Sequence, residues 1–223
     1  MESIRELEIV KGHQIIRLPE GTALLDTGSP ADIGRGLGFE VLGSVWCPTP
    51  LQAGVLDIAS VHLGTDIDWL LGAPFLSSHR TTIDPHRGRV TFSDDDLDVS
   101  ASHAVPIQLE SGVPRIEISV HRNGEVKSAV LDSGAPLSYA PAADVADLAQ
   151  VRIADDFHPS IGMYRTPVYE VLISIGRRAM KVEVGNLPPS LKAAFGDIWI
   201  VGGDFFRDRV ITLDYSAGRI IDS

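Results

Sequence analysis

Short apolar runs separated by turn residues extend along most of the chain. Residues 116–120 alternate apolar and polar side chains, which is the pattern of a strand with one buried face. Asn123-Gly124 and the loop 85–88 each lie between two such runs and are typical of hairpin turns. The pattern predicts a mainly β protein with several hairpins. The apolar runs that we assign as strands are 4–10, 13–18, 22–25, 39–42, 44–46, 55–58, 60–63, 69–72, 81–84, 89–92, 116–120, 126–131, 169–175, 179–184, 198–202, 210–214 and 219–221.

Two short segments are expected to be helical. Val145, Leu148 and Ala149 recur at helical spacing, which predicts a surface helix over residues 141–150. Residues 73–78 are expected to form a second helix with a proline in its first turn. Both segments are short, so the predicted fold class stays mainly β.

Two other segments are expected to be the tips of hairpins. The proline-rich stretch 47–50 separates strand-like residues 44–46 from strand-like residues 55–63, and Trp46 stands beside this tip. Residues 161–167 are the second expected tip. The first of these hairpins is expected to have an exposed end.

The same short motif ends two of the predicted strands. Residues 23–30 and 129–136 each run from apolar residues into Asp, a hydroxyl residue, Gly, a small residue and Pro. Asp26 and Asp132 hold the matching positions. An Asp at the end of a buried strand is costly unless it is paired or used in chemistry, so we expect these two to meet in space. Two carboxylates that share one proton are suited to activating a water molecule.

The two Asp motifs belong to a longer internal repeat. Gly72 and Gly202 each follow one aromatic and two aliphatic residues. Twelve residues further on, each is followed by an aspartate, Asp84 and Asp214. A Gly-Arg pair then follows in both copies. Repeats of this kind indicate two related structural units in one chain.

The repeat divides the chain into two halves of unequal length. We predict an N-terminal lobe at residues 1–93, an acidic linker at 94–104 and a C-terminal lobe at 105–223. The interval from Asp to the repeated Gly is 46 residues in the first half and 70 in the second. The first lobe is therefore expected to be abbreviated. With 223 residues, of which 44% are hydrophobic, the chain is long enough for a packed core in two lobes.

Net charge, the lack of long apolar runs in the sequence and the single cysteine bear on the partners and the location of the protein. The formal net charge is −11, which argues against nucleic acid or an anionic membrane as the main partner. No apolar run is long enough to span a membrane, and the first residues contain no apolar signal core. Cys47 is the single cysteine, so an intramolecular disulfide is excluded. We expect a cytoplasmic protein, although a trimmed leader would give the same sequence.

The residues that carry the repeat resemble those of the aspartic peptidases of the pepsin and retropepsin group. The resemblance rests on Asp26-Thr27-Gly28 and Asp132-Ser133-Gly134, each followed later by two apolar residues and Gly. It implies a two-lobed acid-protease barrel with pseudo-twofold symmetry, built as two retropepsin-like lobes in one chain. It also implies an aspartic endopeptidase that hydrolyses peptide or protein substrates, with no cofactor or metal, as a monomer that contains an internal pseudo-dimer.

The resemblance assigns roles to individual residues. Asp26 and Asp132 would be catalytic, and Thr27 and Ser133 would hydrogen-bond across the pseudo-twofold axis. The remaining members of the two motifs would support the site; they are Gly28, Ser29, Gly134 and Ala135. The Ser29 hydroxyl is expected to favour the ionised form of the neighbouring carboxylate, which predicts that Asp26 is the more acidic partner.

One feature of pepsins has no counterpart at the expected place. In pepsins a hairpin flap of the first lobe carries a Tyr over the site, but residues 30–70 contain no Tyr. Trp46 and, in the second lobe, Tyr164 are the candidates to line the cleft, and ordinary packing is the alternative for each. The missing flap Tyr and the short first lobe also leave open a catalytically inactive, peptide-binding module.

Other chemistries have little support in the sequence. The seven histidines are scattered, with no His-Glu-x-x-His motif, and there is no Gly-x-Ser-x-Gly motif. Cys47 has no evident base partner. Asp84 and Asp214 precede hairpin turns, where Asp commonly caps backbone N–H groups, so we expect structural roles for both.

Overall fold

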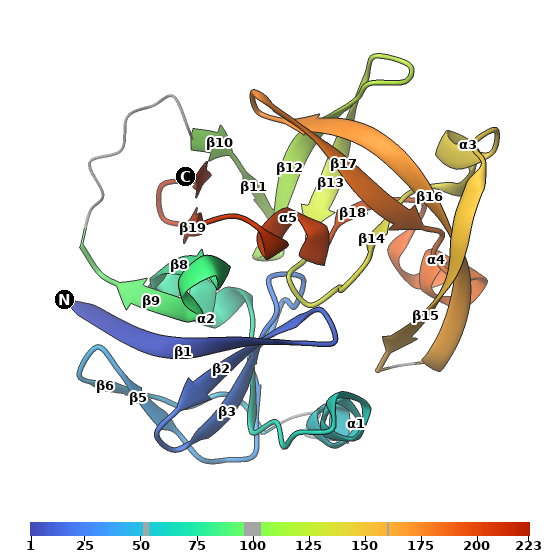
Figure 1. The fold of residues 1–223 in the computed structure, drawn as a ribbon. Helices are drawn as coiled ribbons and strands as arrows, with labels where there is room; N and C mark the ends of the chain where they lie inside the picture. Colours follow the sequence, from blue (N-terminus) through green and yellow to red (C-terminus); the bar gives the residue numbers. More distant parts are fainter. Residues whose placement is uncertain (51–53, 96–103, 160) are drawn as a thin grey trace.

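The computed structural model describes residues 1–50, 54–95, 104–159 and 161–223 and is mainly β, as predicted (Figure 1). The strands of the first half are β1 (Glu2–Val10), β2 (His13–Leu18), β3 (Gly21–Leu25), β4 (Ile33–Gly34), β5 (Phe39–Val41), β6 (Ser44–Trp46), β7 (Trp69–Leu71), β8 (Arg80–Asp84) and β9 (Arg89–Ser93). Those of the second half are β10 (Ala104–Pro106), β11 (Gln108–Glu110), β12 (Val113–Val120), β13 (Glu125–Leu131), β14 (Ser138–Tyr139), β15 (Gln150–His158), β16 (Gly162–Ile175), β17 (Arg178–Gly185), β18 (Trp199–Val201), β19 (Ile211–Asp214) and β20 (Arg219–Asp222). The helices are α1 (Gly54–Leu63), α2 (Ala73–Ser78), α3 (Ala142–Val145), α4 (Pro189–Phe195) and α5 (Gly203–Arg207), with a 3₁₀ turn, η1, at Pro85–Arg87.

Two large sheets organise the molecule, and one of them contains strands from both halves. The ten-stranded sheet has the order β10-β20-β19-β8-β9-β1-β2-β3-β7-β4. Its central junction is the antiparallel pair of β19 and β8, in which Ile211 lies opposite Ile83. The eight-stranded sheet, β11-β12-β13-β18-β14-β17-β16-β15, belongs entirely to the second half. Strands that are far apart in the sequence therefore bind the two halves together.

Most of the predicted linker, residues 96–103, lies outside the described part of the chain. In the described part, β10, β19 and β20 belong to the second half of the sequence but pair within the sheet of the first half. The apolar core is also shared: one cluster of buried side chains includes Leu25 and Phe75 from the first half and Leu131 and Phe205 from the second.

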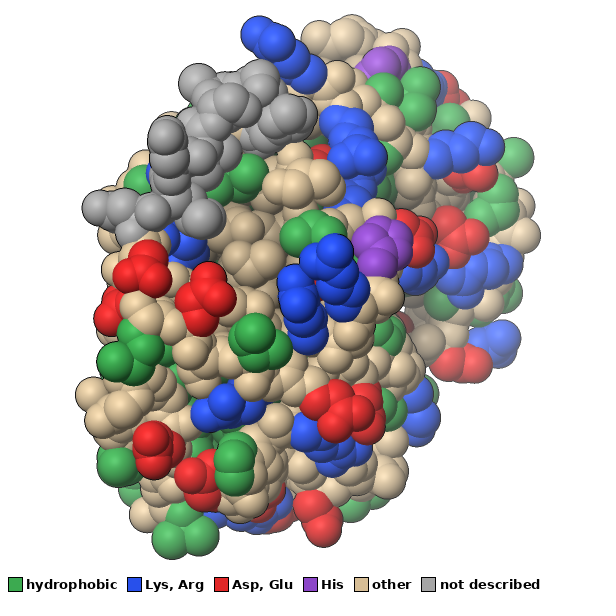
Figure 2. All heavy atoms as spheres, turned by 60° about the vertical axis from the view of Figure 1, so that its left-hand side comes forward, with side chains coloured by type: hydrophobic (Ala, Val, Ile, Leu, Met, Phe, Trp, Pro, Cys, Tyr) green, Lys and Arg blue, Asp and Glu red, His purple; other side chains and the backbone are tan. Residues whose placement is uncertain are grey.

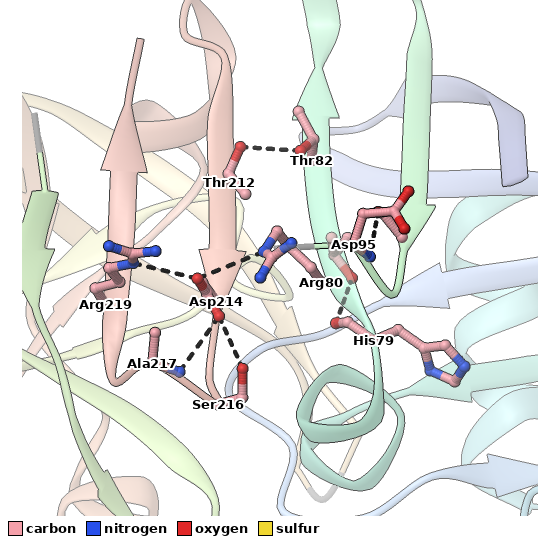
Figure 3. A network of polar contacts seen from close by, with 11 residues as sticks. His79, Arg80, Thr82, Asp95, Thr212, Asp214, Ser216, Ala217 and Arg219 are labelled. Atoms are coloured by element: carbon pink, nitrogen blue, oxygen red, sulfur yellow. Dashed lines mark hydrogen bonds and ion pairs between the residues drawn. The ribbon is translucent and has the colours of Figure 1, made fainter. Parts of the chain in front are cut away.

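A buried ion-pair network reinforces the junction of the two halves (Figure 3). Asp214, only 1% exposed, accepts hydrogen bonds from Ser216, the backbone N–H of Ala217 and Arg219, and it pairs with Arg80 of β8 at 3.4 Å. The structural role expected for Asp214 is confirmed. Asp84 also caps its own turn as expected, since it accepts a hydrogen bond from the backbone N–H of Arg87.

The face of the molecule in Figure 2 carries acidic and basic side chains interspersed with one another. The net negative charge is therefore not gathered into a single acidic patch on this face. Within the described residues, no helix is both long enough and apolar enough to cross a membrane.

The prediction of strands at 55–58 and 60–63 is wrong, because these residues form helix α1. Leu56, Ala59 and Leu63 are buried on one side of the helix, whereas Val61 is 84% exposed. The β-branched residues Val55, Ile58 and Val61 suggested a strand, but the apolar face at helical spacing decided the outcome. The hairpin expected around the tip 47–50 is consequently also wrong. The hairpin observed there is β5–β6, which turns at Leu42-Gly43.

The predicted helix over 141–150 is correct only for its first turn. Helix α3 ends at Val145, and Leu148 packs against the core in the following loop. Gln150 then begins strand β15, which the sequence did not predict. The hairpin expected near 161–167 is present, but β16 begins at Gly162, so most of the predicted tip belongs to a strand.

Candidate active site

Equivalent strands deliver Asp26 and Asp132 to the centre of the molecule. Asp26 follows β3, which pairs in parallel with β7, and Asp132 follows β13, which pairs in parallel with β18. The backbone N–H of Asp26 donates to the carbonyl of Leu71, and that of Asp132 donates to the carbonyl of Val201, at 2.9 Å in both cases. The repeated apolar pair before Gly thus fixes the start of each Asp loop.

The repeated glycines pack directly behind these loops. A Cβ on Gly72 would lie 2.6 Å from the carbonyl oxygen of Ser29, and one on Gly202 would lie 2.6 Å from that of Ala135. Only glycine lets the two segments approach so closely, which explains why Gly recurs at this point of the repeat.

A polar side chain braces each glycine, and the sequence analysis did not identify either one. The backbone N–H of Gly72 donates to the Asp32 carboxylate at 2.7 Å, and that of Gly202 donates to the Ser138 hydroxyl at 3.0 Å. Asp32 follows Asp26 by six residues, and Ser138 follows Asp132 by six residues. That shared spacing was the available clue.

Thr27 and Ser133 connect the two loops by reciprocal hydrogen bonds. The Thr27 hydroxyl donates to the carbonyl of Leu131 at 2.7 Å and accepts from the backbone N–H of Ser133 at 2.8 Å. The Ser133 hydroxyl donates to the carbonyl of Leu25 at 2.9 Å and accepts from the backbone N–H of Thr27 at 3.0 Å. Both side chains are fully buried, and the expected hydrogen bonding across the pseudo-twofold axis is confirmed.

Gly28 and Gly134 bring each carboxylate against the opposite loop. A Cβ on Gly28 would lie 2.4 Å from Cγ of Asp132, and a Cβ on Gly134 would lie 2.5 Å from Cγ of Asp26. The Asp26 and Asp132 carboxyl groups also lie within hydrogen-bonding reach of each other. The structure therefore brings together the two residues that the sequence predicted as a pair, which we call the dyad.

The electrostatic environment of the dyad favours one shared proton. Burial raises the pKa of both carboxyls above the usual range, and the neighbouring charge of Asp132 raises that of Asp26 further. For Asp132 the effect of burial is opposed by a hydrogen bond from Asp26 and by the backbone N–H of Gly134, which donates to it at 2.9 Å. The pair therefore titrates as one unit, which holds a proton more tightly than an ordinary carboxyl does.

The Ser29 hydroxyl does not make the contact expected of it, and the prediction that Asp26 is the more acidic partner stays a prediction. The Ser29 hydroxyl donates to the carbonyl of Ala31 at 2.7 Å, so it is committed to its own turn rather than to the carboxylate. The Ser29 backbone N–H does favour the ionised form of Asp26, but this effect is smaller than those of burial and of Asp132. At the equivalent position, Ala135 presents only its backbone N–H to Asp132.

The two candidates for lining the cleft lie in different surroundings. Trp46 packs edge-on against Phe75 and His79, and its indole N–H donates to Asp32 at 3.0 Å. It therefore contributes to the brace behind Gly72. Tyr164 lies on β16, and the negative charge of Asp132 contributes to the raised pKa of its phenol, after the larger effects of burial and Asp156. Of the two, Tyr164 is the one placed within electrostatic reach of the dyad.

A pocket of about 350 Å³ opens beside the Asp132 loop. Pro136 and Leu137, which follow that loop, line one side, and Lys11 and His62 of the first half line another. Residues of the β15–β16 hairpin close it on a third side. In the described part of the chain, no three His, Cys, Asp or Glu side chains converge as they would around a metal ion.

Comparisons with known proteins bear on the fold. No family model matches the chain, and no curated protein matches its sequence. Among solved structures, the crystal structure of Basic 7S globulin from soybean, which has a pepsin-like fold, covers 100% of this chain and 94% of its own length. The TM-score of that match is 0.53 and the sequence identity is 9%. The solution structure of Simian Foamy Virus (mac) protease covers 40% of this chain and 88% of its own, with a TM-score of 0.31 and 20% identity.

The soybean match, which spans the whole chain, shows that the chain has a two-lobed, pepsin-like fold. At 9% identity it shows the fold alone, and the foamy virus match is too weak to add to it.

Proposed function

We propose that this chain is an aspartic endopeptidase, in which Asp26 and Asp132 activate a water molecule to hydrolyse peptide bonds. The observation that carries the proposal is the dyad: two carboxyl groups within hydrogen-bonding reach, each against the glycine of the opposite loop. Like charges so close together do not both ionise easily, so the pair titrates as one unit with one proton.

In the proposed mechanism the two carboxyls have different roles: Asp132 is the base and Asp26 is the acid. Ionised Asp132 accepts a proton from a water molecule as the water oxygen attacks the peptide carbonyl carbon. Asp26 simultaneously donates its proton to the carbonyl oxygen, which gives a neutral tetrahedral intermediate. The C–N bond then breaks as Asp132 passes its proton to the leaving nitrogen, and Asp26 recovers a proton from one of the two hydroxyls. The cycle returns both carboxyls to their starting states without a covalent enzyme intermediate.

The surroundings of the dyad support a site that is held rigid. Thr27 and Ser133 fix the two loops to each other through four hydrogen bonds, all in a buried position. Prearranged groups of this kind contribute to catalysis because they need no rearrangement as charge moves in the transition state. An extended peptide is the proposed substrate, with its scissile bond at the dyad and a neighbouring segment in the pocket beside the Asp132 loop.

Peptide cleavage by the purified protein tests the proposal. Denatured casein and an unbiased peptide library are incubated from pH 3 to 7 with and without pepstatin, and new termini are identified by mass spectrometry. We expect pepstatin-sensitive cleavage that is lost in Asp132→Asn and retained in Asp197→Asn, which removes an exposed carboxylate paired with Lys192. Peptide binding without cleavage by the wild type would overturn the peptidase and favour the peptide-binding module.

A further inference from the structure

Asp156 is a buried carboxylate outside the dyad. It lies on β15, is 6% exposed, and points to the same side of the hairpin as Ala154. This side packs against an apolar cluster formed by Leu137, Tyr139, Ala154 and Val168. A carboxylate in such surroundings is costly unless several donors satisfy it.

Three donors satisfy Asp156. The backbone N–H of Phe157 donates to Oδ1 at 2.7 Å, and the hydroxyls of Tyr139 and Tyr164 both reach Oδ2. The two phenol oxygens also lie 2.5 Å apart. Burial raises the pKa of both phenols, so each keeps its proton and serves as a donor.

The network links the hairpin to the scaffold of Asp132. Tyr139 lies on β14, opposite Ile200 of β18, the strand whose last residue holds the Asp132 backbone. Tyr164 lies directly opposite Asp156 across the hairpin. Through these three side chains, the hairpin is fixed relative to the loop that carries Asp132.

The hydrogen bonds of the network decide whether the Tyr164 hydroxyl can donate to a ligand or accept from it. A phenol has one proton to donate, and here the protons of Tyr139 and Tyr164 are shared among Asp156 Oδ2 and the two phenol oxygens. The Tyr164 oxygen therefore keeps a lone pair and has no proton left for a ligand. It can accept a hydrogen bond from the backbone N–H of an extended peptide that enters the pocket.

We propose that Asp156, which lines the pocket, is a positioning residue that holds the Tyr164 hydroxyl as an acceptor for a substrate N–H group. This inference rests on the proposed function. Asp156 acts through Tyr164 and does not touch the scissile bond. The hairpin also contacts the first half, where Phe157 stacks on His62 of α1 with ring centroids 4.2 Å apart.

A double-mutant cycle separates positioning from simple structural support. We expect Tyr164→Phe and Asp156→Ala each to lower kcat/KM about tenfold, and the double variant to be no worse than Tyr164→Phe alone, because both remove the same interaction. Asp156→Asn keeps one acceptor oxygen and should recover part of the loss. The matched control is Asp144→Asn, a carboxylate of the same half that accepts from the Trp199 indole N–H at 2.7 Å and lies away from the pocket; kcat/KM should be unchanged. Additive losses in the double variant would overturn the proposal.

A spectroscopic arm tests the geometry without relying on activity. The chain has four tyrosines, which can be labelled with 3-fluorotyrosine and assigned by Tyr→Phe replacement of each in turn. We expect Asp156→Asn to shift the ¹⁹F resonances of Tyr139 and Tyr164 but not that of Tyr169. Asp132→Asn should shift Tyr164 and leave Tyr139 in place.

The two arms distinguish failure of the proposed function from failure of this inference. If the wild type cleaves no peptide but the ¹⁹F shifts follow the expected pattern, the peptidase is wrong and the coupling of Asp156, Tyr164 and Asp132 stands. If Tyr164 does not respond to Asp156→Asn, the positioning role is wrong whatever the activity.

Discussion

At the scale of single residues, the approach of the two carboxylates depends on two glycines. Gly28 and Gly134 each leave room for the aspartate of the other loop, and a Cβ at either position would lie within 2.6 Å of carboxylate atoms. Neither glycine is needed for a positive φ. Their role is to admit the opposite carboxylate.

Gly28→Ala should therefore abolish peptide cleavage by displacing the Asp132 carboxylate. Because the added methyl group meets a side chain rather than the backbone, we expect the protein to stay folded, with a loss of stability of about 1–3 kcal/mol. Urea unfolding and peptide cleavage measure the two effects. The control is Gly54→Ala at the start of α1, where a Cβ meets nothing within 4 Å. Equal activity of the two variants would contradict this account of Gly28.

The raised pKa values of the dyad predict a pH-dependent stability. A carboxyl with a raised pKa holds its proton more tightly in the folded chain, so it favours folding below the ordinary carboxyl range. That contribution is lost as pH rises through the raised pKa, and the ionised dyad then opposes folding. Asp26→Asn should raise Tm at pH 7 by about 2–4 °C, with a smaller difference at pH 3. Thermal melts at both pH values measure this, and a shift that is equal at both would refute it.

Single residues could be predicted from the sequence where a local motif was repeated. Asp26, Asp132, Thr27 and Ser133 were found because each motif has a second copy. The partner of the Ser29 hydroxyl could not be predicted, because it depends on the direction in which that side chain points. Asp156 was missed because its two phenol partners lie on other strands, Tyr139 on β14 and Tyr164 on β16.

At the scale of elements, α1 replaces the predicted strands in the abbreviated first half. Its one buried side packs Leu56 and Leu63 against Ile15, Leu24 and Leu70. The sequence of this segment is ambiguous, because its β-branched residues favour a strand while its apolar residues also fit the spacing of a helix. The contacts of the folded chain decide between the two. Strand β15 was missed because Val151 and Ile153 are exposed and Asp156 is buried, which reverses the usual pattern.

Two substitutions in α1 test its assignment. Leu56 is fully buried, so Leu56→Ala should lower the free energy of unfolding by about 2–5 kcal/mol. Val61 is 84% exposed, and Val61→Ala should be neutral or slightly stabilising, since Ala is the better helix former. Both are measured by urea unfolding. A strand with Val61 on its buried side would give the opposite order.

At the scale of the whole molecule, a shared sheet joins the two halves. The β19–β8 pair and the Asp214 network join them, and Thr82 and Thr212 add a hydroxyl–hydroxyl contact at 2.9 Å across the same junction (Figure 3). The internal repeat is reflected in equivalent strand pairs, because β3 pairs in parallel with β7 as β13 does with β18. It did not reveal that the last strands of the second half complete the sheet of the first.

Asp214→Asn should destabilise the whole molecule, by about 3 kcal/mol at pH 7, because it leaves the largely buried Arg80 beside a neutral amide. Burial alone would raise the pKa of Asp214, but Ser216, Arg219 and Arg80 lower it below its usual value. Its stabilising effect is therefore present above the ordinary carboxyl pKa and lost as pH falls through the lowered one.

Asp84→Asn is the control for Asp214→Asn. Asp84 holds the same place in the repeat, but its arginine partners are more exposed, so Asp84→Asn should cost less. Urea unfolding at pH 7 and pH 3 compares the two. A loss for Asp214→Asn that persists unchanged in acid would contradict the ion-pair explanation.

The most direct test of the central claim is the rate at which one peptide, selected from the library, is cleaved by wild type, Asp26→Asn and Asp132→Asn. Each variant keeps the shape of the dyad and removes the capacity to exchange a proton at one position. We predict cleavage by the wild type and none by either variant, with all three folded by circular dichroism. Cleavage that continues at the wild-type rate in either variant would contradict the account.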